Sequence, residues 1–189
     1  MSAAGASAVL VPVKAFALAK ARLAPALGGP ARAALARTMA GAVLRAAAPL
    51  PVAVACEDDE VAEWARRRGA LVVWTPGRGL NGAVADGVAA LAAAGAVRVV
   101  VAHADLPGAR DLAALAGGAG VTLVPDRHHD GTNVACVPAG AGYRFAYGPR
   151  SFHRHRAEAV RLGLELRVVE APELAWDVDR PADLAAVRC

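Results

Sequence analysis

The chain has 189 residues, of which 56% are hydrophobic and 20% charged, and its formal net charge is +4. This length suits one domain with a buried core, so we expect a single domain over residues 1–189, with residues 1–8 disordered. Its apolar runs are far shorter than the roughly 20 residues of a membrane span. The three cysteines lack a metal-ligand spacing, and the charge is too small for a nucleic-acid binder. We therefore expect a cytoplasmic protein whose partners include neither nucleic acid nor a membrane.

Short apolar runs alternate with helical periodicity through the first two thirds of the chain. The pattern predicts strands at 9–13, 52–56, 71–74, 97–102 and 121–125, and helices at 30–48, 58–68, 81–94 and 109–116. In the last third it predicts strands at 133–137 and 166–169, an extended edge segment at 175–179, and helices at 152–162 and 181–187. Such alternation is typical of an α/β fold with a mostly parallel central sheet and helices on both faces.

The basic residues are unevenly distributed. Nineteen are arginines and only two are lysines, Lys14 and Lys20, and no acidic residue precedes Glu57. Lys14, Lys20 and Arg22 follow the first predicted strand, at the sheet edge where open α/β sheets bind ligands. A lysine ammonium suits a phosphate whose charge grows during reaction, and an arginine fork suits fixed holding. We therefore predict that these three cations are catalytic and meet a triphosphate; the alternative is an ordinary solvated basic face.

Three carboxylates are candidates for a metal site. Asp105 follows the most apolar strand, and Asp177 and Asp179 are two residues apart, which places both side chains on one face of an extended segment. Close carboxylates repel one another unless a cation lies between them, and oxygen ligands with room for water and phosphate are typical of Mg²⁺. We predict a magnesium site at these three residues. For Asp179 the alternative is a helix lead-in before Pro181.

A phosphate pocket is predicted in the last third of the chain. A polar loop at 126–133 includes Thr132, and Gly148 and Ser151 precede a predicted helix. Ser151 is a candidate N-cap, so a phosphate would accept backbone N–H groups at this helix start, with Gly148 allowing close approach and Thr132 adding a hydroxyl donor. The alternative is a plain turn followed by a plain helix start.

A glycine motif suggests a different function. Residues 77–82 match G-x-G-x-x-G between a strand and a helix, and Asp105 lies about twenty residues further on, as in a dinucleotide-binding fingerprint. However, Thr75 and Pro76 separate the strand from the first glycine. The motif is thus consistent with an NAD(P)-dependent oxidoreductase as an alternative function. The simpler interpretation is that residues 77–82 are a glycine-rich surface loop.

Taken together, six stretches resemble the CofC/FbiD family, and the resemblance runs from about residue 9 to 187. They are V-P-V-K-x-x-x-x-A-K-x-R-L (11–23), G-L-N-x-A-x-x-x-G (79–87), A-D-L-P (104–107), P-D-R-x-x-x-G-T-N (125–133), F-x-x-G-P-x-S-F-x-x-H (145–155) and D-V-D-x-P-x-D-L (177–184). Members of this family are guanylyltransferases that make the phospho-acid building block of the deazaflavin coenzyme F-420. The resemblance implies a single-domain, Rossmann-like nucleotidyltransferase (GT-A-like) fold.

The resemblance also implies substrates and roles. GTP would donate GMP to the phosphate of phosphoenolpyruvate or 2-phospho-L-lactate, release pyrophosphate, and leave a product for the next enzyme of the pathway. We favour phosphoenolpyruvate because the composition looks bacterial and bacterial relatives tend to use it. Magnesium would bind Asp105, Asp177 and Asp179. The other implied sites are the triphosphate contacts (Lys14, Lys20 and Arg22), the nucleotide site (Pro12, Lys14, Gly79, Asn81 and Gly82) and the acceptor site (Thr132, Gly148 and Ser151).

The chain departs from the family pattern in two places. His103 stands where many relatives have a small or apolar residue, and 128–130 is this chain's own version of a variable stretch. Both departures leave the acceptor preference open. Another nucleotidyl or sugar-nucleotide transferase of the same fold remains an alternative, since a fold does not determine a substrate.

Overall fold

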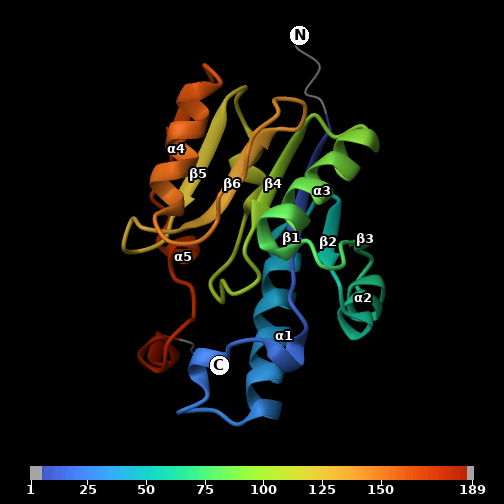
Figure 1. The fold of residues 1–189 in the computed structure, drawn as a ribbon, viewed down its shortest axis with the longest axis vertical. Coiled ribbons are helices and arrows are strands. Elements are labelled where there is room, and N and C mark those ends of the chain that lie inside the picture. The colour runs from blue at the N-terminus through green and yellow to red at the C-terminus, as the bar shows by residue number, and fades with distance from the viewer. Residues whose placement is uncertain (1–5, 187–189) are drawn as a thin grey trace.

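The computed structural model describes residues 6–186, which form an α/β fold around one seven-stranded sheet (Figure 1). In the order β3-β2-β1-β4-β6-β5-β7, the strands are Leu71–Trp74, Val52–Cys56, Ser7–Pro12, Arg98–Ala102, Thr132–Pro138, Val121–Pro125 and Leu166–Val168. The α-helices are α1 (Gly29–Ala46), α2 (Asp59–Arg66), α3 (Gly79–Ala93), α4 (Ser151–Arg161) and α5 (Pro172–Ala175). The 3-10 helices are η1 (Phe16–Leu18), η2 (Ala21–Leu23), η3 (Leu112–Ala116) and η4 (Pro181–Ala186). Among the described residues, no helix is long and apolar enough to cross a bilayer.

The sheet is parallel except at β6. Strand β6 runs antiparallel to both of its neighbours, β4 and β5. It follows β5 after the short loop 126–131, and a connection of this length can only join antiparallel strands. The insertion of β6 between β4 and β5 places its first residues beside the end of β4, where the His103 N–H donates to the carbonyl of Asn133 at 3.0 Å. Residues far apart in the chain therefore meet at the sheet edge that carries the site.

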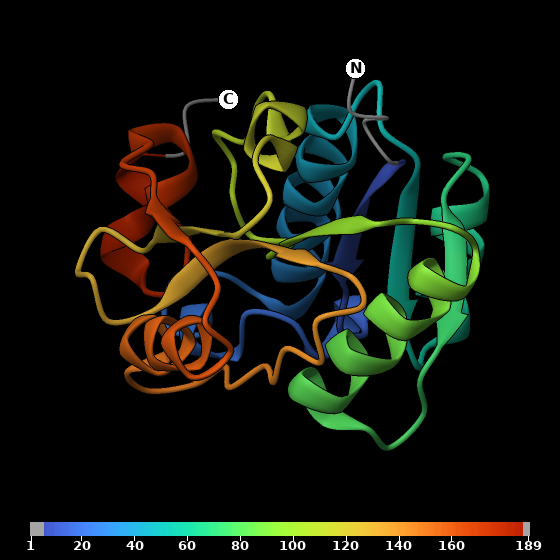
Figure 2. The same ribbon diagram turned by 90° about the horizontal axis from the view of Figure 1, so that it is seen from above.

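Helices cover both faces of the sheet, as predicted. Val9 and Val11 pack with α1 on one face, whereas Leu10 packs with α3 on the other. Helix α4 lies on the same side as α3, over β5 and β6 (Figure 2). Because both faces are buried, the central strands are almost continuously apolar, which is why they could be predicted from apolar runs.

The structure corrects four local expectations. Strand β1 begins at Ser7, so the expected disorder is wrong for residues 7 and 8; residues 1–5 lie outside the described part. The helix predicted at 109–116 is only η3, because Asp111 has a left-handed backbone (φ 47°) and begins a 3-10 turn. The segment 175–179 is not an edge strand, since Ala175 ends α5 and 176–179 join no strand. The closing helix is a 3-10 helix ending at Ala186, and residue 187 is outside the description.

Candidate active site

A cavity of about 620 Å³ lies at the carboxyl ends of β1 and β4. This is the edge where open α/β sheets bind their ligands. The predicted nucleotide-site residues Pro12, Lys14 and Gly79 line the cavity, and so do His103 and Asp105. The cavity is thus formed by the loop after β1, the start of α3 and the end of β4.

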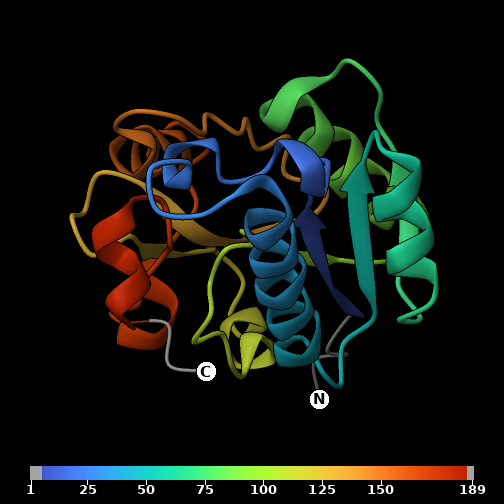
Figure 3. The same cartoon turned by 90° about the horizontal axis from the view of Figure 1, so that it is seen from below.

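The loop between β1 and α1 carries the predicted cations and reaches across to the C-terminal segment (Figure 3). Phe16 and Leu23, which are both buried, anchor this loop. Between them Lys20 adopts a left-handed backbone (φ 55°), an uncommon conformation for a residue with a side chain. The loop is therefore held in one shape that directs Lys20 inward, where its side chain is only 9% exposed.

The three cations differ in their partners. The Lys20 Nζ lies 2.5 Å from Asp105 Oδ2 and 3.3 Å from Asp179 Oδ1, and the Arg22 Nη1 donates to Asp179 Oδ2 at 2.7 Å. Within residues 6–186, Lys14 is exposed at the cavity and forms no ion pair. The structure thus leaves Lys14 free for a phosphate and engages Lys20 and Arg22 with the predicted metal ligands.

The predicted metal ligands converge. Carboxylate oxygens of Asp105, Asp177 and Asp179 all lie within 4.8 Å of one another. Asp105 Oδ1 is buried and has no hydrogen-bond partner among the described residues. Burial, together with the charges of Asp105 and Asp179, raises the pKa of Asp177. Burial alone would raise the pKa of Asp105 as well, but the adjacent Lys20 ammonium, together with His103 and a backbone hydrogen bond, lowers it. The three carboxylates therefore offer oxygen ligands, and their mutual repulsion favours the binding of a cation between them.

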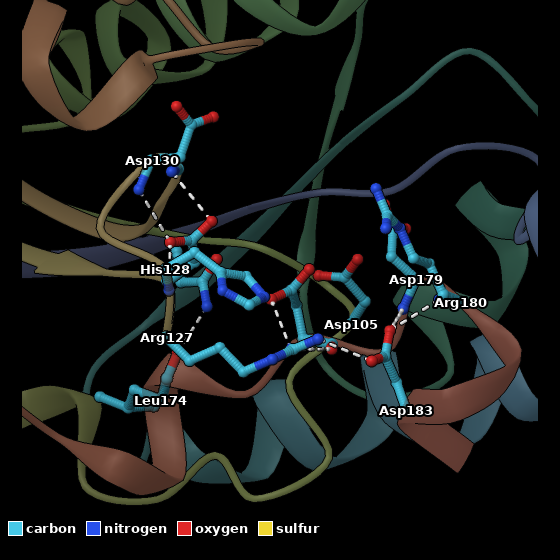
Figure 4. Close-up of polar contacts among 12 residues, drawn as sticks. Asp105, Arg127, His128, Asp130, Leu174, Asp179, Arg180 and Asp183 are labelled. Atoms are coloured by element: carbon cyan, nitrogen blue, oxygen red, sulfur yellow. Dashed lines mark hydrogen bonds and ion pairs between the residues drawn. The ribbon is translucent and has the colours of Figure 1, made fainter.

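A partly buried ion pair that the sequence did not reveal supports this segment (Figure 4). Arg127 donates to Asp183 Oδ1 at 2.6 Å and to the carbonyl of Asp177 at 3.1 Å. The other oxygen of Asp183 accepts the backbone N–H groups of Asp179 at 2.9 Å and Arg180 at 2.7 Å. Although burial opposes it, these hydrogen bonds and Arg127 lower the pKa of Asp183. Arg127 and Asp183 therefore fix the backbone that carries two of the three carboxylates.

The predicted acceptor residues are adjacent, but not in the arrangement expected. The Thr132 N–H donates to Ser151 Oγ at 3.0 Å, and the two residues are 1% and 2% exposed. Ser151 is the first residue of α4, and the N-cap is Arg150, so the N-cap expectation is wrong. The amide of Ser151 is bonded to the carbonyl of Gly148 at 3.0 Å, and that of Phe152 to the carbonyl of Asp130 at 3.0 Å. These two amides are therefore already engaged within the protein, and Thr132, Gly148 and Ser151 are not among the residues that line the cavity.

Asn81, predicted to bind nucleotide, has a structural partner. Its Oδ1 accepts the Tyr147 N–H at 2.6 Å and its Nδ2 donates to the Tyr147 carbonyl at 3.3 Å. The amide therefore ties the start of α3 to the loop that precedes α4. Asn81 and Gly82 are not among the residues lining the cavity.

The glycine motif at 77–82 follows β3, which is an edge strand. A dinucleotide-binding fingerprint instead follows the first strand at the centre of the sheet, where the strand order reverses. The motif here only begins α3, with positive φ at Gly77 and Gly79. The oxidoreductase alternative has no support in this arrangement.

The comparisons with known proteins agree with the geometry. The family model described as "Guanylyl transferase CofC like" matches residues 7–188. A phosphoenolpyruvate guanylyltransferase from Sphaerobacter thermophilus is 38% identical over 93% of this chain and 89% of its own length, and one from Rubrobacter xylanophilus is 37% identical over 93% and 90%. Among solved structures, a nucleotidyl transferase from Methanothermobacter thermautotroptrophicus superposes with a TM-score of 0.67 at 18% identity, covering 97% of this chain and 96% of that one. The fold is therefore that of the nucleotidyltransferases, and the chain belongs to the CofC-like guanylyltransferase family.

Proposed function

We propose that this enzyme transfers GMP from GTP to the phosphate of phosphoenolpyruvate and releases pyrophosphate. The observation that carries this proposal is the convergence, at one cavity, of the Lys14–Arg22 loop with the carboxylates of Asp105, Asp177 and Asp179. Support for the acceptor comes from the relatives, which are named phosphoenolpyruvate guanylyltransferases. 2-Phospho-L-lactate carries the same phosphate and carboxylate and is the alternative acceptor.

The cavity is the proposed GTP site. Its volume of about 620 Å³ lies within the roughly 300–1,000 Å³ of typical small-molecule sites. Lys14 is exposed there and forms no ion pair among the described residues, so its ammonium is available to a phosphate. Pro12 and Gly79 also line the cavity, and we assign them to nucleotide contacts.

The carboxylate cluster fits Mg²⁺. Three close carboxylates, with the buried Asp105 Oδ1 lacking any partner in the described structure, are the hard oxygen ligands that this ion prefers. Asp105, Asp177 and Asp179 would hold it, and when bound it would supply positive charge to neutralise the triphosphate. Lys20 already supplies one positive charge to two of these carboxylates.

The chemistry requires positioning more than proton transfer. A phosphate oxygen of the acceptor attacks the α-phosphorus of GTP, the bond from that phosphorus to the β-phosphate bridging oxygen breaks, and pyrophosphate leaves with the electron pair. The attacking oxygen is already anionic at neutral pH, so no general base is needed. Lys14 neutralises charge on the triphosphate, and the hydroxyls of Thr132 and Ser151, near Gly148, orient the acceptor.

We place the reaction in the cytoplasm, where a further enzyme would consume the product. Cys56 and Cys136 are free and buried in the described structure, as suits a reducing compartment. The product joins two phosphates through an anhydride, so the next reaction of the pathway must be a transfer that uses this activated bond.

A single assay tests the proposal. The protein is mixed with GTP, Mg²⁺ and either phosphoenolpyruvate or 2-phospho-L-lactate, pyrophosphate is measured, and the new anhydride is identified by ³¹P NMR. We expect pyrophosphate release to require GTP, an acceptor and the divalent ion together, and to be faster with phosphoenolpyruvate. Turnover with neither acceptor, or turnover only with another nucleotide, would overturn the proposal.

A further inference from the structure

A buried histidine next to the proposed acceptor site has both ring nitrogens engaged. His155 is 0% exposed, its Nε2 accepts the backbone N–H of Ala146 at 2.9 Å, and its Nδ1 lies 2.9 Å from Thr132 Oγ1. A backbone N–H can only donate, so Nε2 must carry the lone pair. In a neutral ring the proton is then on Nδ1, and His155 donates to the Thr132 oxygen.

This assignment determines what the Thr132 hydroxyl does. Because its oxygen accepts from His155, its own proton needs a different acceptor, and the described structure holds none. Thr132 is 1% exposed, so bulk water does not satisfy this donor. Ser151 is in the same situation, since its oxygen accepts the Thr132 N–H at 3.0 Å and its own hydroxyl proton has no acceptor among residues 6–186.

Two residues with a free hydroxyl proton thus meet where β6 and α4 begin, joined by the hydrogen bond from the Thr132 N–H to Ser151 Oγ. Two neighbouring rings carry further polar atoms without a partner among the described residues, His103 Nε2 and Tyr147 Oη. The Tyr147 ring lies 4.8 Å from the His155 ring and 4.9 Å from the His103 ring, measured between centroids, and His103 lines the cavity. Thr132 and Ser151 are not among the residues that line the cavity, and buried hydroxyl donors without an acceptor are suited to the anionic oxygens of an acceptor that reaches them.

We propose that neutral His155 is a positioning residue that holds the Thr132 hydroxyl as a hydrogen-bond donor toward an anionic oxygen of the acceptor. This inference rests on the proposed function, because it assigns the acceptor to Thr132 and Ser151. The ring itself is rigidly placed, since Tyr143 Oη donates to the His155 carbonyl at 2.7 Å and Phe145 and Tyr147 pack against the imidazole. His155 acts only through Thr132 and does not touch the substrate.

Two substitutions separate this role from simple packing. His155→Asn places an amide near the Nδ1 position and keeps a donor for Thr132, whereas His155→Gln places its amide near Nε2 and keeps an acceptor for Ala146. We expect His155→Gln to raise the KM for phosphoenolpyruvate about tenfold and leave the KM for GTP within about twofold. His155→Asn should stay within about threefold of the wild type for both. Equal effects of the two substitutions, or a larger effect of Asn, would overturn the inference.

A double-mutant cycle with Thr132 tests whether the effect passes through the hydroxyl. Thr132→Val removes the hydroxyl at nearly constant volume and should raise the KM for phosphoenolpyruvate about ten- to a hundredfold, with Thr132→Ser as the conservative control. Adding His155→Gln to Thr132→Val should cause no further rise. Multiplicative effects in the double variant would show that His155 acts elsewhere and would contradict the inference.

The tautomer can be measured without any substrate. Two-bond ¹H–¹⁵N correlation spectra distinguish a ring protonated on Nδ1 from one protonated on Nε2, and the His155 signals are assigned by their loss in His155→Gln. We expect the Nδ1–H form throughout pH 6–8; the other tautomer or an imidazolium would overturn the inference. Absence of turnover in the wild-type protein would instead overturn the proposed function, and with it the acceptor role of Thr132, while the spectrum would still decide the tautomer.

Discussion

The two lysines of this chain have different environments, and we expect their loss to have different consequences. Lys14 is exposed at the cavity and has no ion-pair partner in the described structure. Its removal therefore breaks no ion pair of the folded protein. Lys14→Ala should lower kcat about a hundredfold or more, as loss of a charge that stabilises a developing anion typically does, with the melting temperature unchanged. Arg66→Ala, which removes an exposed cation from the end of α2, is the control and should retain full activity. Near wild-type turnover by Lys14→Ala would contradict the assignment.

Lys20 is held between Asp105 and Asp179 and is expected to affect folding as well as activity. Removing one partner of a buried ion pair costs about 3–5 kcal/mol, and because Asp105 is 22% exposed we expect about 2 kcal/mol for Lys20→Met. Chemical denaturation measures this loss of unfolding free energy, and Lys14→Met provides the matched comparison. An unchanged denaturation midpoint for Lys20→Met would show that the ion pair contributes nothing to the fold.

His155 makes folding sensitive to acid. Burial, with smaller contributions from His103 and Arg154, lowers the pKa of His155 to about 4, while the nearby Glu158 opposes this shift. The unfolded chain, with a His pKa of about 6.5, therefore binds the proton more readily than the native protein between pH 6.5 and 4. The free energy of unfolding should fall as the pH falls through this window, by up to about 3 kcal/mol in total.

The comparison with a variant isolates this effect from other titrating groups. His155→Gln lacks the ionisable ring, so its stability should fall less steeply between pH 6.5 and 4 than that of the wild type, as measured by urea denaturation at a series of pH values. Parallel stability curves for the two proteins would mean that His155 is not buried in neutral form.

Among the elements, the contact between α3 and β1 is the one most sensitive to volume. An added Cβ at Gly87 would lie 2.6 Å from Leu10 Cδ2 and 2.7 Å from its Cδ1, in the core between α3 and β1. Gly87→Ala should therefore destabilise the protein by about 1–3 kcal/mol, even though alanine favours a helix. Gly41→Ala is the matched control in α1, because its Cβ would meet only the end of the Arg45 side chain at 3.5 Å. Gly41→Ala should be neutral or stabilising by up to about 1 kcal/mol. Thermal unfolding of both variants, compared with the wild type, measures these changes in the free energy of unfolding.

The elements that the sequence predicted best are those whose bounds are marked by neighbouring residues in the chain. The observed bounds of β2 and β3 equal the predicted ranges 52–56 and 71–74, because short apolar runs there end at turn-forming residues. The direction of β6 was not predicted, since it depends on which strands it joins. Helix η3 was expected to be longer, because apolar periodicity does not show the left-handed Asp111 that precedes it.

The same distinction applies to the site. Lys14 and Asp105 were predicted together because they follow the strands β1 and β4, whose ends meet at one sheet edge. Asp177 and Asp179 were predicted from their two-residue spacing, although 176–179 join no strand. The contacts of Arg127 with Asp183 and of His155 with Thr132 span 56 and 23 residues, and neither partner has a spacing that marks the other. Such pairs follow from tertiary packing and were missed. Asn81 was found by its motif, but its observed partner is the backbone of Tyr147.

At the scale of the molecule, the site joins two parts of the chain. The chain from β1 to the loop after β4 provides Lys14, Asp105 and most of the cavity lining, whereas β6, α4 and the segment after α5 carry Thr132, Ser151 and the other two carboxylates. Ligands that bind across this junction stabilise the folded state by mass action. GTP at about 100 times its Kd contributes about 2.7 kcal/mol, which for a chain of this size raises the melting temperature by about 5–10 °C.

We expect that rise to depend on Mg²⁺, because the triphosphate and the carboxylate cluster repel each other without a cation between them. Thermal unfolding with GTP alone, Mg²⁺ alone and both together measures the dependence, and only the combination should give the full shift. Asp177→Asn is the informative variant, since burial and the charges of Asp105 and Asp179 raise the pKa of Asp177 and thus disfavour its charged form in the free protein. Its melting temperature without ligand should therefore be no lower than that of the wild type, while most of the increment from GTP with Mg²⁺ should be lost. An undiminished increment in Asp177→Asn would mean that the triphosphate binds without this carboxylate, and the metal would then have to be held elsewhere.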